Sequence, residues 1–320
     1  IGAARPSIAD PFLPKKIEAG RVEDIRECIG CNICVTADFT MTPLRCTQNP
    51  TMGEEWRKGW HPERIDTKHA DESVLIVGAG PAGLEAARAL GQRGYDVTLA
   101  EGTDAVGGRV AREGALPGLS AWRRVADYRS YQISQMPNVE TYLESNLTAD
   151  QVLEFGADHV VIATGAKWCD SGVGRENFAP IPRDKAAPVM TVDAIMAGED
   201  TTGPVVIFDD DHFYMGGVLA ELIRSKGHDV TLVTPAADVS HWTHNTLEQT
   251  RIQKRLMEMD VKIVPLHNVS HIGTDNVTLE CGYTEREHDI PCGTFIPVTM
   301  RQTVDGLYLG VQKLLTDTGP

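Results

Sequence analysis

The stretch SVLIVGAGPAGLEAARALGQRGYDVTLAE, residues 73–101, decides the fold of this 320-residue chain. Its apolar start, SVLIV, indicates a buried parallel strand, the glycines open a helical segment, and YDVTLAE indicates the next strand. A strand, a helix and a second strand in this order form a βαβ unit, which requires a parallel sheet. We therefore predict an α/β fold.

The glycine loop, residues 78–83, predicts a nucleotide site. Gly78 allows a tight turn, Gly80 lets a pyrophosphate approach the backbone, and Gly83 lets the helix pack closely on the strand. The helix N-terminus attracts phosphates, and Glu101 at the end of the second strand can accept hydrogen bonds from ribose hydroxyls. An acid there favours a free 2′-hydroxyl, so we expect ADP, FAD or NAD rather than NADP. A tight turn without a ligand is the alternative.

A second glycine pair, Gly107 and Gly108, is followed by Arg109. Glycines allow another close approach of backbone and ligand, and this loop resembles the one that flavoprotein disulfide reductases place near the flavin diphosphate. We expect Gly108 and Arg109 to contribute to the same nucleotide site. An ordinary turn is the alternative.

A second βαβ unit follows later in the chain, and further elements extend it into a second α/β domain. The expected strands and helices cover residues 204–210, 216–226, 228–235, 246–259, 261–265 and 276–280. The apolar stretch 306–310 also resembles a strand.

The second unit lacks the glycine pattern of the first. Aligned on the glycine that ends each helix, Gly83 falls on Gly216 and Glu101 on Thr234; counted from the strand end, Asp209 and Asp211 replace the first two glycines. The acidic loop, residues 209–217 (DDDHFYMGG), is two residues longer and adds the bulk of Phe213 and Tyr214. Its carboxylates repel a pyrophosphate, and its Cβ atoms block the backbone. We predict that nicotinamide-nucleotide binding is lost; a cation-binding or merely solvated loop is the alternative.

Four cysteines upstream predict an iron–sulfur cluster. Their spacing is C-x2-C-x2-C-x11-C, and Gly30 lets the backbone pass close to an inorganic sulfur. Zinc is the main alternative, but the second C-x2-C pair of structural zinc sites is missing, and disulfides form poorly in so tight a loop. Unligated core thiols are the third possibility. The predicted ligands of a [4Fe–4S] cluster are Cys28, Cys31, Cys34 and Cys46.

Composition excludes several classes of protein. The chain is 42% hydrophobic and 23% charged, as in soluble globular proteins, and its net charge of −15 argues against nucleic-acid binding and against docking on anionic lipid. No apolar run approaches about 18 residues, and nothing at the start resembles a signal peptide. The remaining cysteines are scattered and fit half-buried thiols in a reducing compartment, so we expect a cytoplasmic protein. They are Cys169, Cys281 and Cys292.

The motifs resemble those of the trimethylamine, dimethylamine and histamine dehydrogenases, iron–sulfur flavoproteins related to 2,4-dienoyl-CoA reductase. The cysteine region and LPGLSAWRRV are most similar to the histamine dehydrogenases. The similarity covers essentially the whole chain. The matching segments, in order, are ECIGCNICV, RCTQNP, GEEWRKGWHPERI, VLIVGAGPAGLEAARAL, LPGLSAW, VVIATGA and FDDDHFYMGG.

This resemblance implies an N-terminal TIM barrel with covalent FMN that oxidises a small amine. Electrons then pass through the cluster to an electron-transfer flavoprotein, while two reductase-like domains retain an ADP. Ala4 and Arg5 match the last barrel strand and loop, where the arginine holds the FMN phosphate. A homodimer is the expected assembly. The barrel's catalytic residues, and the family's last segment that completes the nucleotide domain, are expected to lie outside this chain.

The predicted organisation has four parts. They are the end of the FMN-binding barrel (1–20), the [4Fe–4S] segment and connector (21–70), an ADP- or FAD-binding Rossmann-like domain (71–170) and a degenerate NAD(P)-binding-like domain (171–320).

The leading interpretation is the electron-transfer portion of an amine dehydrogenase. One alternative is an NAD(P)H-dependent 2,4-dienoyl-CoA reductase-like flavin oxidoreductase, and another is a non-catalytic electron-carrier subunit. For protein docking, the candidates are Glu27 and the Trp122–Arg124 segment, with an ordinary solvated face as the alternative.

Overall fold

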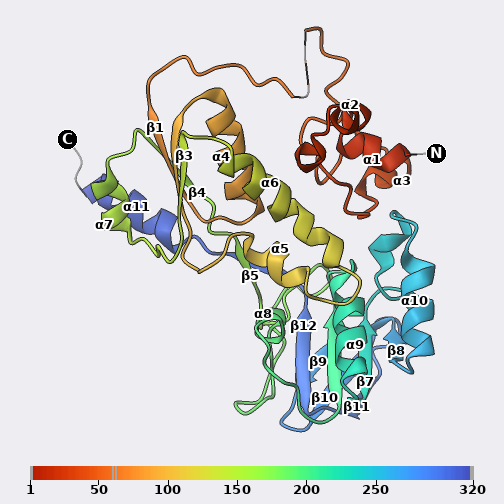
Figure 1. The fold of residues 1–320 in the computed structure, drawn as a ribbon. Helices are drawn as coiled ribbons and strands as arrows, with labels where there is room; N and C mark the ends of the chain where they lie inside the picture. Colours follow the sequence, from red (N-terminus) through yellow and green to blue (C-terminus); the bar gives the residue numbers. More distant parts are fainter. Residues whose placement is uncertain (1–2, 60, 62, 318–320) are drawn as a thin grey trace. The chain divides into compact units, whose positions relative to one another are not determined.

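The computed structural model describes residues 3–59, 61 and 63–317. These residues form two compact units, each an α/β structure (Figure 1). The first unit contains the chain up to Ala115, residues 119–165 and the chain from Thr303 onward. The second contains residues 116–118 and 166–302. Within the described ranges, no helix is both long and apolar enough to cross a bilayer.

A four-stranded parallel sheet forms the centre of the first unit. Its order is β3-β2-β1-β4, and α4 connects β1 to β2, as predicted for residues 73–101. The two central strands are almost entirely buried because helices cover both faces of the sheet. The bounds are β1 Ser73–Val77, α4 Pro81–Arg93, β2 Asp96–Ala100, β3 Val139–Tyr142 and β4 His159–Ile162.

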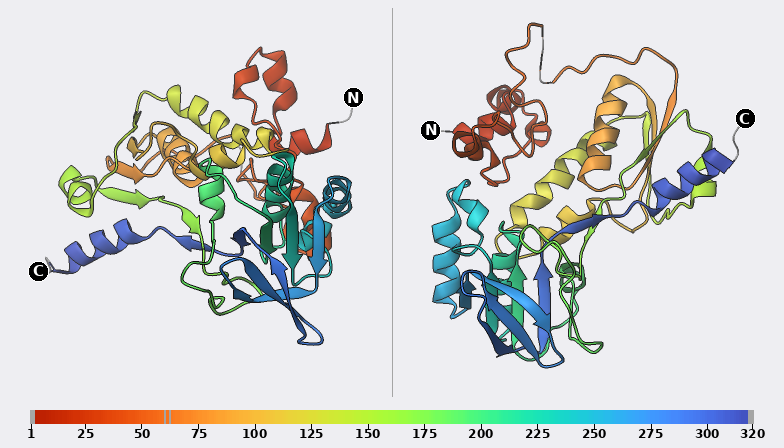
Figure 2. Two further views of the ribbon diagram at one scale, coloured as in Figure 1. Left: turned by 90° about the horizontal axis from the view of Figure 1, so that it is seen from below. Right: turned by 180° about the vertical axis from the view of Figure 1, so that it is seen from behind.

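Two groups of helices cover this sheet. On one side α6 (Arg124–Ser134) packs along α4, around a core that includes Ile76, Leu84 and Ile133. On the other side α7 (Ala149–Phe155) packs against α11 (Gly306–Asp317), as Figure 2 shows in two views. The smaller elements here are α5 Gly108–Glu113 and η3 Ser120–Arg123.

The stretch 306–310 was expected to be a strand, and this was wrong. It begins helix α11, in which Leu307 and Val311 stand one helical turn apart and pack on the core around Val152. The predicted domain boundaries also differ from the structure. The second unit begins at Ala166 instead of residue 171, and the chain from Thr303 onward returns to the first unit.

The N-terminal segment of the first unit is helical. Ala4 and Arg5 lie in the first turn of α1, instead of on a barrel strand or loop, because Ser7 N–H donates to Ala3 C=O (3.1 Å) and closes a helical turn. The expectation for residues 1–2 lies outside the described residues. The elements are α1 Ala4–Ala9, α2 Leu13–Glu18, η1 Val22–Asp24, η2 Ile33–Val35 and α3 Thr36–Thr40.

The second unit contains a parallel and an antiparallel sheet. The parallel sheet has the order β12-β6-β7-β8, and the antiparallel sheet has the order β11-β10-β9. Short strands β5 and β13 pair where the chain enters and leaves the unit. The bounds are β5 Ala166–Trp168, α8 Val192–Met196, β6 Val205–Asp209, α9 Met215–Ser225, β7 Val230–Thr234, η4 His241–His244, α10 Gln249–Glu258, β8 Lys262–Pro265, β9 His267–Ile272, β10 Asn276–Cys281, β11 Glu287–Pro291, β12 Thr294–Val298 and β13 Arg301–Thr303.

Candidate redox centre and nucleotide site

The cysteine loop, residues 27–48, carries all four predicted cluster ligands. All four cysteines are partly exposed. Gly30 (φ +72°) and Asn32 (φ +55°) are left-handed, so the backbone changes direction at both residues of this loop. Gly30 N–H also donates to Cys28 Sγ (3.4 Å), and Cys31 Sγ lies 3.1 Å from Thr47 Oγ1.

The four thiols lie within electrostatic reach of one another. Burial is the largest cause that raises the pKa of Cys31, and the nearby Cys46 and Cys28 raise it further. Burial raises the pKa of Cys34, and the nearby Cys31, Cys46 and Cys28 raise it further. The sequence-predicted ligands are therefore brought together.

Their spacing distinguishes between two kinds of metal centre. Among the described residues, no three cysteine sulfurs lie within 4.8 Å of one another. In a tetrahedral zinc site with Zn–S bonds of about 2.3 Å, the sulfurs would be about 3.8 Å apart. A cubane takes one thiolate at each of four separate corners, so it needs a wider arrangement. The cysteine loop thus fits a four-iron cluster better than a zinc ion.

Helix α6 holds the cysteine loop in place. Arg124 donates to Cys28 C=O (3.2 Å) and pairs with Glu27 (3.2 Å). Arg129, which is buried, donates to the side-chain oxygen of Gln48 (2.9 Å), while Gln48 donates to Glu27 C=O (3.0 Å). Both ends of the loop are therefore fixed to the nucleotide domain. The sequence analysis missed Arg129 and Gln48 because nothing in the local sequence links them.

The glycine loop has the conformation that the sequence predicted, with a tight turn at Gly78 and close helix packing at Gly83. Gly78 has φ +104°, and a Cβ there would lie 2.5 Å from Ala163 O. A Cβ on Gly83 would overlap the carbonyl oxygen of Gly78, so only glycine allows α4 to pack this closely. Gly80 has no heavy atom within 4 Å of its Cβ position, and the N-terminus of α4 has no side-chain cap. Space and free N–H groups are thus available where a phosphate would bind.

The second glycine pair contacts the first loop. Gly107 N–H donates to Ala79 C=O (2.8 Å), and a Cβ on Gly108 would lie 3.1 Å from Gly80 Cα. Arg109 instead pairs with Glu113 on α5 (3.1 Å). Gly108 therefore belongs to the candidate nucleotide site, while no contact of Arg109 with the glycine loop is observed.

Glu101 has structural contacts that the sequence did not predict. Its carboxylate accepts hydrogen bonds from Ala79 N–H (2.7 Å) and from the backbone N–H and hydroxyl of Thr103 (both 2.9 Å). It thereby holds the glycine loop against the end of β2. A contact with ribose stays a prediction.

The acidic loop fills the corresponding position in the second unit. Asp209 is fully buried, and a Cβ on Gly216 at the start of α9 would lie 2.6 Å from Asp209 Cγ. Asp210 is also fully buried and accepts hydrogen bonds from Glu176 N–H (3.0 Å) and Asn177 N–H (3.4 Å). The sequence analysis expected carboxylates that repel a pyrophosphate. Both carboxylates are instead buried inside the second unit.

Burial perturbs the ionisation of this loop. Burial, followed by the charge of Asp211, raises the pKa of Asp209 to about 7. Asp209 Oδ1 accepts a hydrogen bond from His212 N–H (3.0 Å), but its Oδ2 has no hydrogen-bond partner among the described residues. Burial opposes ionisation of His212, yet its hydrogen bond to Asp210 and the charge of Asp209 raise its pKa.

The aromatic residues of the acidic loop are packed against a neighbouring turn. Phe213 contacts Trp242 edge-on at 5.0 Å and Tyr214 at 4.7 Å, measured between ring centroids. Thr234, which replaces the acid of the first unit, is fully buried 3.4 Å from the His212 ring. These contacts hold the acidic loop against η4 and β7.

Comparison with known proteins identifies the family. The family model for pyridine nucleotide-disulphide oxidoreductases matches residues 72–299, which is more than half of the chain. The chain belongs to this family.

Within this family the chain is similar to amine dehydrogenases. Dimethylamine dehydrogenase of Hyphomicrobium sp. (strain x) is 41% identical over 96% of this chain and 45% of its own length. The structure of histamine dehydrogenase from Rhizobium sp. 4-9 is 56% identical, with a TM-score of 0.96 over 99% of this chain and 49% of that one. The resemblance predicted from the motifs is confirmed, as is the α/β class.

A further solved structure supports the same grouping. The 6-hydroxypseudooxynicotine amine oxidase from Pseudomonas geniculata N1 is 46% identical, with a TM-score of 0.94 over 98% of this chain and 47% of that one. The chain therefore spans about half the length of the relatives that it matches.

The two βαβ turns of this member of the pyridine nucleotide-disulphide oxidoreductase family are lined differently. In the first, the space at Gly80 is open; in the second, the carboxylate of Asp209 packs against Gly216 at the start of α9.

Proposed function

We propose that this chain is the electron-transfer portion of an iron–sulfur flavoprotein amine dehydrogenase. In the proposal, a small amine is oxidised at a covalently bound FMN in a part of the protein that this chain does not include. Electrons then pass through a [4Fe–4S] cluster to an electron-transfer flavoprotein, in a cytoplasmic homodimer. The observation that carries the proposal is the cysteine loop, whose four thiols are spread too widely for zinc and are fixed to a nucleotide domain.

The chain's own residues define what each part would do. Cys28, Cys31, Cys34 and Cys46 would hold the cluster, which accepts and releases single electrons. The Arg124 guanidinium, which donates to Cys28 C=O and pairs with Glu27, would hold the loop around the cluster in position.

The glycine loop and Gly108 would hold the pyrophosphate of ADP or FAD, because the space at Gly80 is open. Arg5 hydrogen-bonds to the side chain of Asn32, inside the cysteine loop. If Arg5 contacts the FMN phosphate, as the resemblance implies, the flavin would lie close to the cluster ligands.

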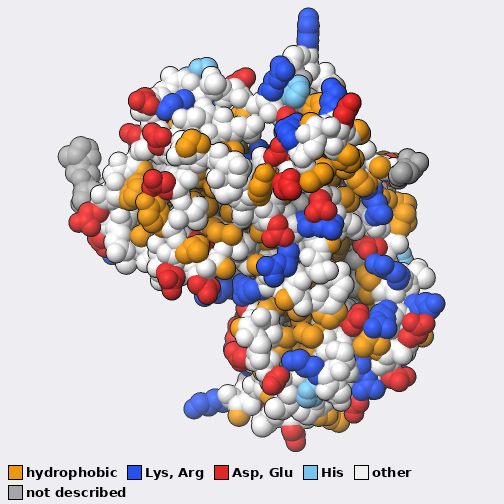
Figure 3. Space-filling model, in the orientation of Figure 1, with side chains coloured by type: hydrophobic (Ala, Val, Ile, Leu, Met, Phe, Trp, Pro, Cys, Tyr) orange, Lys and Arg blue, Asp and Glu red, His pale blue; other side chains and the backbone are white. Residues whose placement is uncertain are grey.

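The face in Figure 3 is compatible with a protein partner. Acidic and basic side chains are interspersed on it without a large basic patch. Glu27 and Arg124, both proposed to lie near the docking surface, pair with each other and are partly exposed, so a partner could compete for either charge.

Metal analysis of the full-length protein tests the cluster. We expect about four iron and four sulfide per chain in anaerobically purified wild type, because a cubane contains four of each. The Cys46→Ser variant is expected to lose most of this iron. Cys169→Ser, which removes a half-buried cysteine of the second unit, serves as the control and should retain it. Stoichiometric zinc without iron would reject the proposal.

The second candidate function is an NAD(P)H-dependent flavin reductase, which the family name favours. The buried carboxylates of Asp209 and Asp210 count against it, since acidic side chains at this turn disfavour a pyrophosphate. We expect substrate-reduced protein to be reoxidised rapidly by ferrocenium or an electron-transfer flavoprotein, and not by NAD⁺ or NADP⁺. Stopped-flow absorbance of the flavin measures both rates. Rapid reoxidation by the nicotinamide nucleotides alone would favour the reductase.

A further inference from the structure

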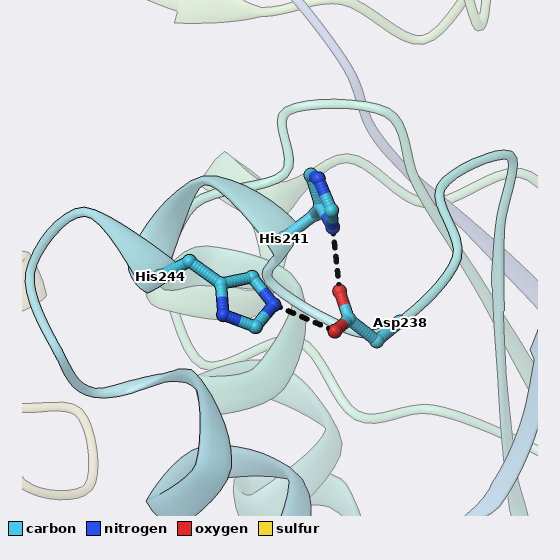
Figure 4. Close-up of side chains that lie close together, drawn as sticks. All are labelled: Asp238, His241 and His244. Atoms are coloured by element: carbon cyan, nitrogen blue, oxygen red, sulfur yellow. Dashed lines mark hydrogen bonds and ion pairs between the residues drawn. The ribbon is translucent and has the colours of Figure 1, made fainter. Parts of the chain in front are cut away.

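A short turn in the second unit carries three metal-ligating side chains at equal spacing. Asp238, His241 and His244 follow one another at intervals of three residues, and the histidines are the first and last residues of η4. A 3₁₀ helix has three residues per turn, so side chains at this interval project from the same face. Figure 4 shows the two rings directed toward the one carboxylate.

The contacts bring the ligand atoms together. His241 Nδ1 lies 2.7 Å from Asp238 Oδ1, and His244 Nε2 lies 2.7 Å from Asp238 Oδ2. One nitrogen from each ring and one carboxylate oxygen all lie within 4.8 Å of one another. Both histidine side chains are about half exposed, at 54% and 51%, so an ion from solvent can reach them.

Burial and hydrogen bonds fix the backbone of this turn. Ser240 is fully buried in a left-handed conformation (φ +50°), and its C=O accepts a hydrogen bond from the Thr243 hydroxyl (2.7 Å). Gln249 donates to Val239 C=O (3.3 Å). Trp242 N–H donates to His212 C=O (2.8 Å) and so fastens the turn to the acidic loop. The three ligands are thus presented by a fixed scaffold, which lowers the entropic cost of binding an ion.

We propose that Asp238, His241 and His244 bind a divalent first-row transition-metal ion of the zinc type. Two imidazoles and one carboxylate are a ligand set that suits such ions, and three protein ligands leave a position open for water. The ion takes the place of the hydrogens between the rings and the carboxylate, and in each neutral ring the proton then resides on the other nitrogen. Because Trp242 joins this turn to the acidic loop, the bound ion stiffens the support of that loop.

In the part of the chain that the structure describes, the other histidine–carboxylate pairs lack a third ligand within 4.8 Å. His271 pairs with Asp184 (3.4 Å) in the same unit, and both side chains are similarly exposed. Among the described residues, Asp238, His241 and His244 are the one set of three such ligands within 4.8 Å. His271 therefore provides a matched control.

Equilibrium dialysis of the full-length protein against Zn²⁺, followed by metal analysis, tests the site. We expect one tightly bound zinc per chain in wild type and in His271→Gln. In His241→Gln and in His244→Gln the zinc affinity should fall at least tenfold, because loss of even an outer-shell partner costs about 10–100-fold. Iron is measured in the same samples to detect zinc that has entered the cysteine loop.

Three results would overturn the proposal. One is zinc affinity in either variant equal to wild type, and another is an equal loss in His271→Gln. The third is zinc uptake that matches a loss of iron. Thermal unfolding gives an independent measurement: added Zn²⁺ should raise the midpoint for wild type and His271→Gln, and leave His241→Gln unchanged.

Discussion

At pH 8 the Asp209→Asn variant is expected to be more stable than wild type by about 4 kcal/mol. The pKa of Asp209 is about 7 in the folded protein, against an ordinary value of 3.8. Between these values the folded state binds a proton that the unfolded state has lost, so stability falls as pH rises through this window. Above pH 7 the wild type carries the full cost of a buried charge, and the neutral amide avoids it.

Thermal unfolding at two pH values measures this effect. The midpoint should rise by about 8–16 °C at pH 8, since 1 kcal/mol shifts a domain of 150–250 residues by about 2–4 °C. Near pH 5.5 the difference in unfolding free energy between Asp209→Asn and wild type should fall to about half. Part of the cost that Asp209 ionisation imposes on the folded wild type at pH 8 is then absent.

Asp210→Asn is the matched control, and the opposite sign is expected. Asp210 accepts backbone N–H bonds from Glu176 and Asn177 and pairs with His212 (3.2 Å). The asparagine side chain lacks the negative charge, and its NH2 group would face backbone N–H groups that need an acceptor. The Asp210→Asn variant should therefore be less stable than wild type at pH 8. If Asp209→Asn and Asp210→Asn lowered the stability equally at pH 8, the prediction that the buried charge of Asp209 destabilises the wild type would be wrong.

The Gly83→Ala variant is expected to lose about 3 kcal/mol of stability, the upper end of the usual cost of overpacking, because the neighbouring atom belongs to the backbone. The added Cβ would overlap Gly78 O, a backbone atom inside the tightest turn of the glycine loop. Neither the turn nor helix α4 can move away without opening the packing of α4 on β1. The variant should also fail to retain an adenine nucleotide.

Gly80→Ala separates folding from binding. Gly80 has a negative φ of −72°, and its Cβ position is open, so alanine should leave the unfolding midpoint of nucleotide-free protein unchanged. Its methyl group would instead occupy the space of the pyrophosphate, and the extracted ADP or FAD should fall at least tenfold. Midpoints are compared after removal of nucleotide, and nucleotide is measured chromatographically. Undiminished nucleotide in Gly80→Ala would reject the assignment of this loop.

The sequence predicted the two βαβ units because their signals are contiguous. It did not predict β12, whose run TFIPV contains a proline. The structure explains this proline: β12 lies at the edge of its sheet, where a missing N–H breaks no ladder. Helix α11 was missed for a different reason. Its packing against α7, where a Cβ on Gly310 would lie 3.1 Å from Ala149 Cβ, joins residues far apart in the chain.

The candidate site shows the same division. The cysteine spacing is local and was sufficient to select four residues that the fold brings together. The side chains that hold them, Arg124 and Arg129, come 96 and 81 residues after their partners Cys28 and Gln48, so no sequence window contains both. The sequence led us to expect that Glu101 contacts the ribose of a nucleotide. Its hydrogen bond from Ala79 N–H (2.7 Å) could be recognised only in the folded loop.

The return of α11 to the first unit imposes an order on biosynthesis. A ribosome releases a chain from its N-terminus, so residues 166–302 all emerge before Thr303. The second unit can therefore finish folding while the first still lacks α11, and the apolar surface around Val152 stays uncovered during that interval. The nascent first unit must therefore tolerate this exposed apolar face until its last helix is translated.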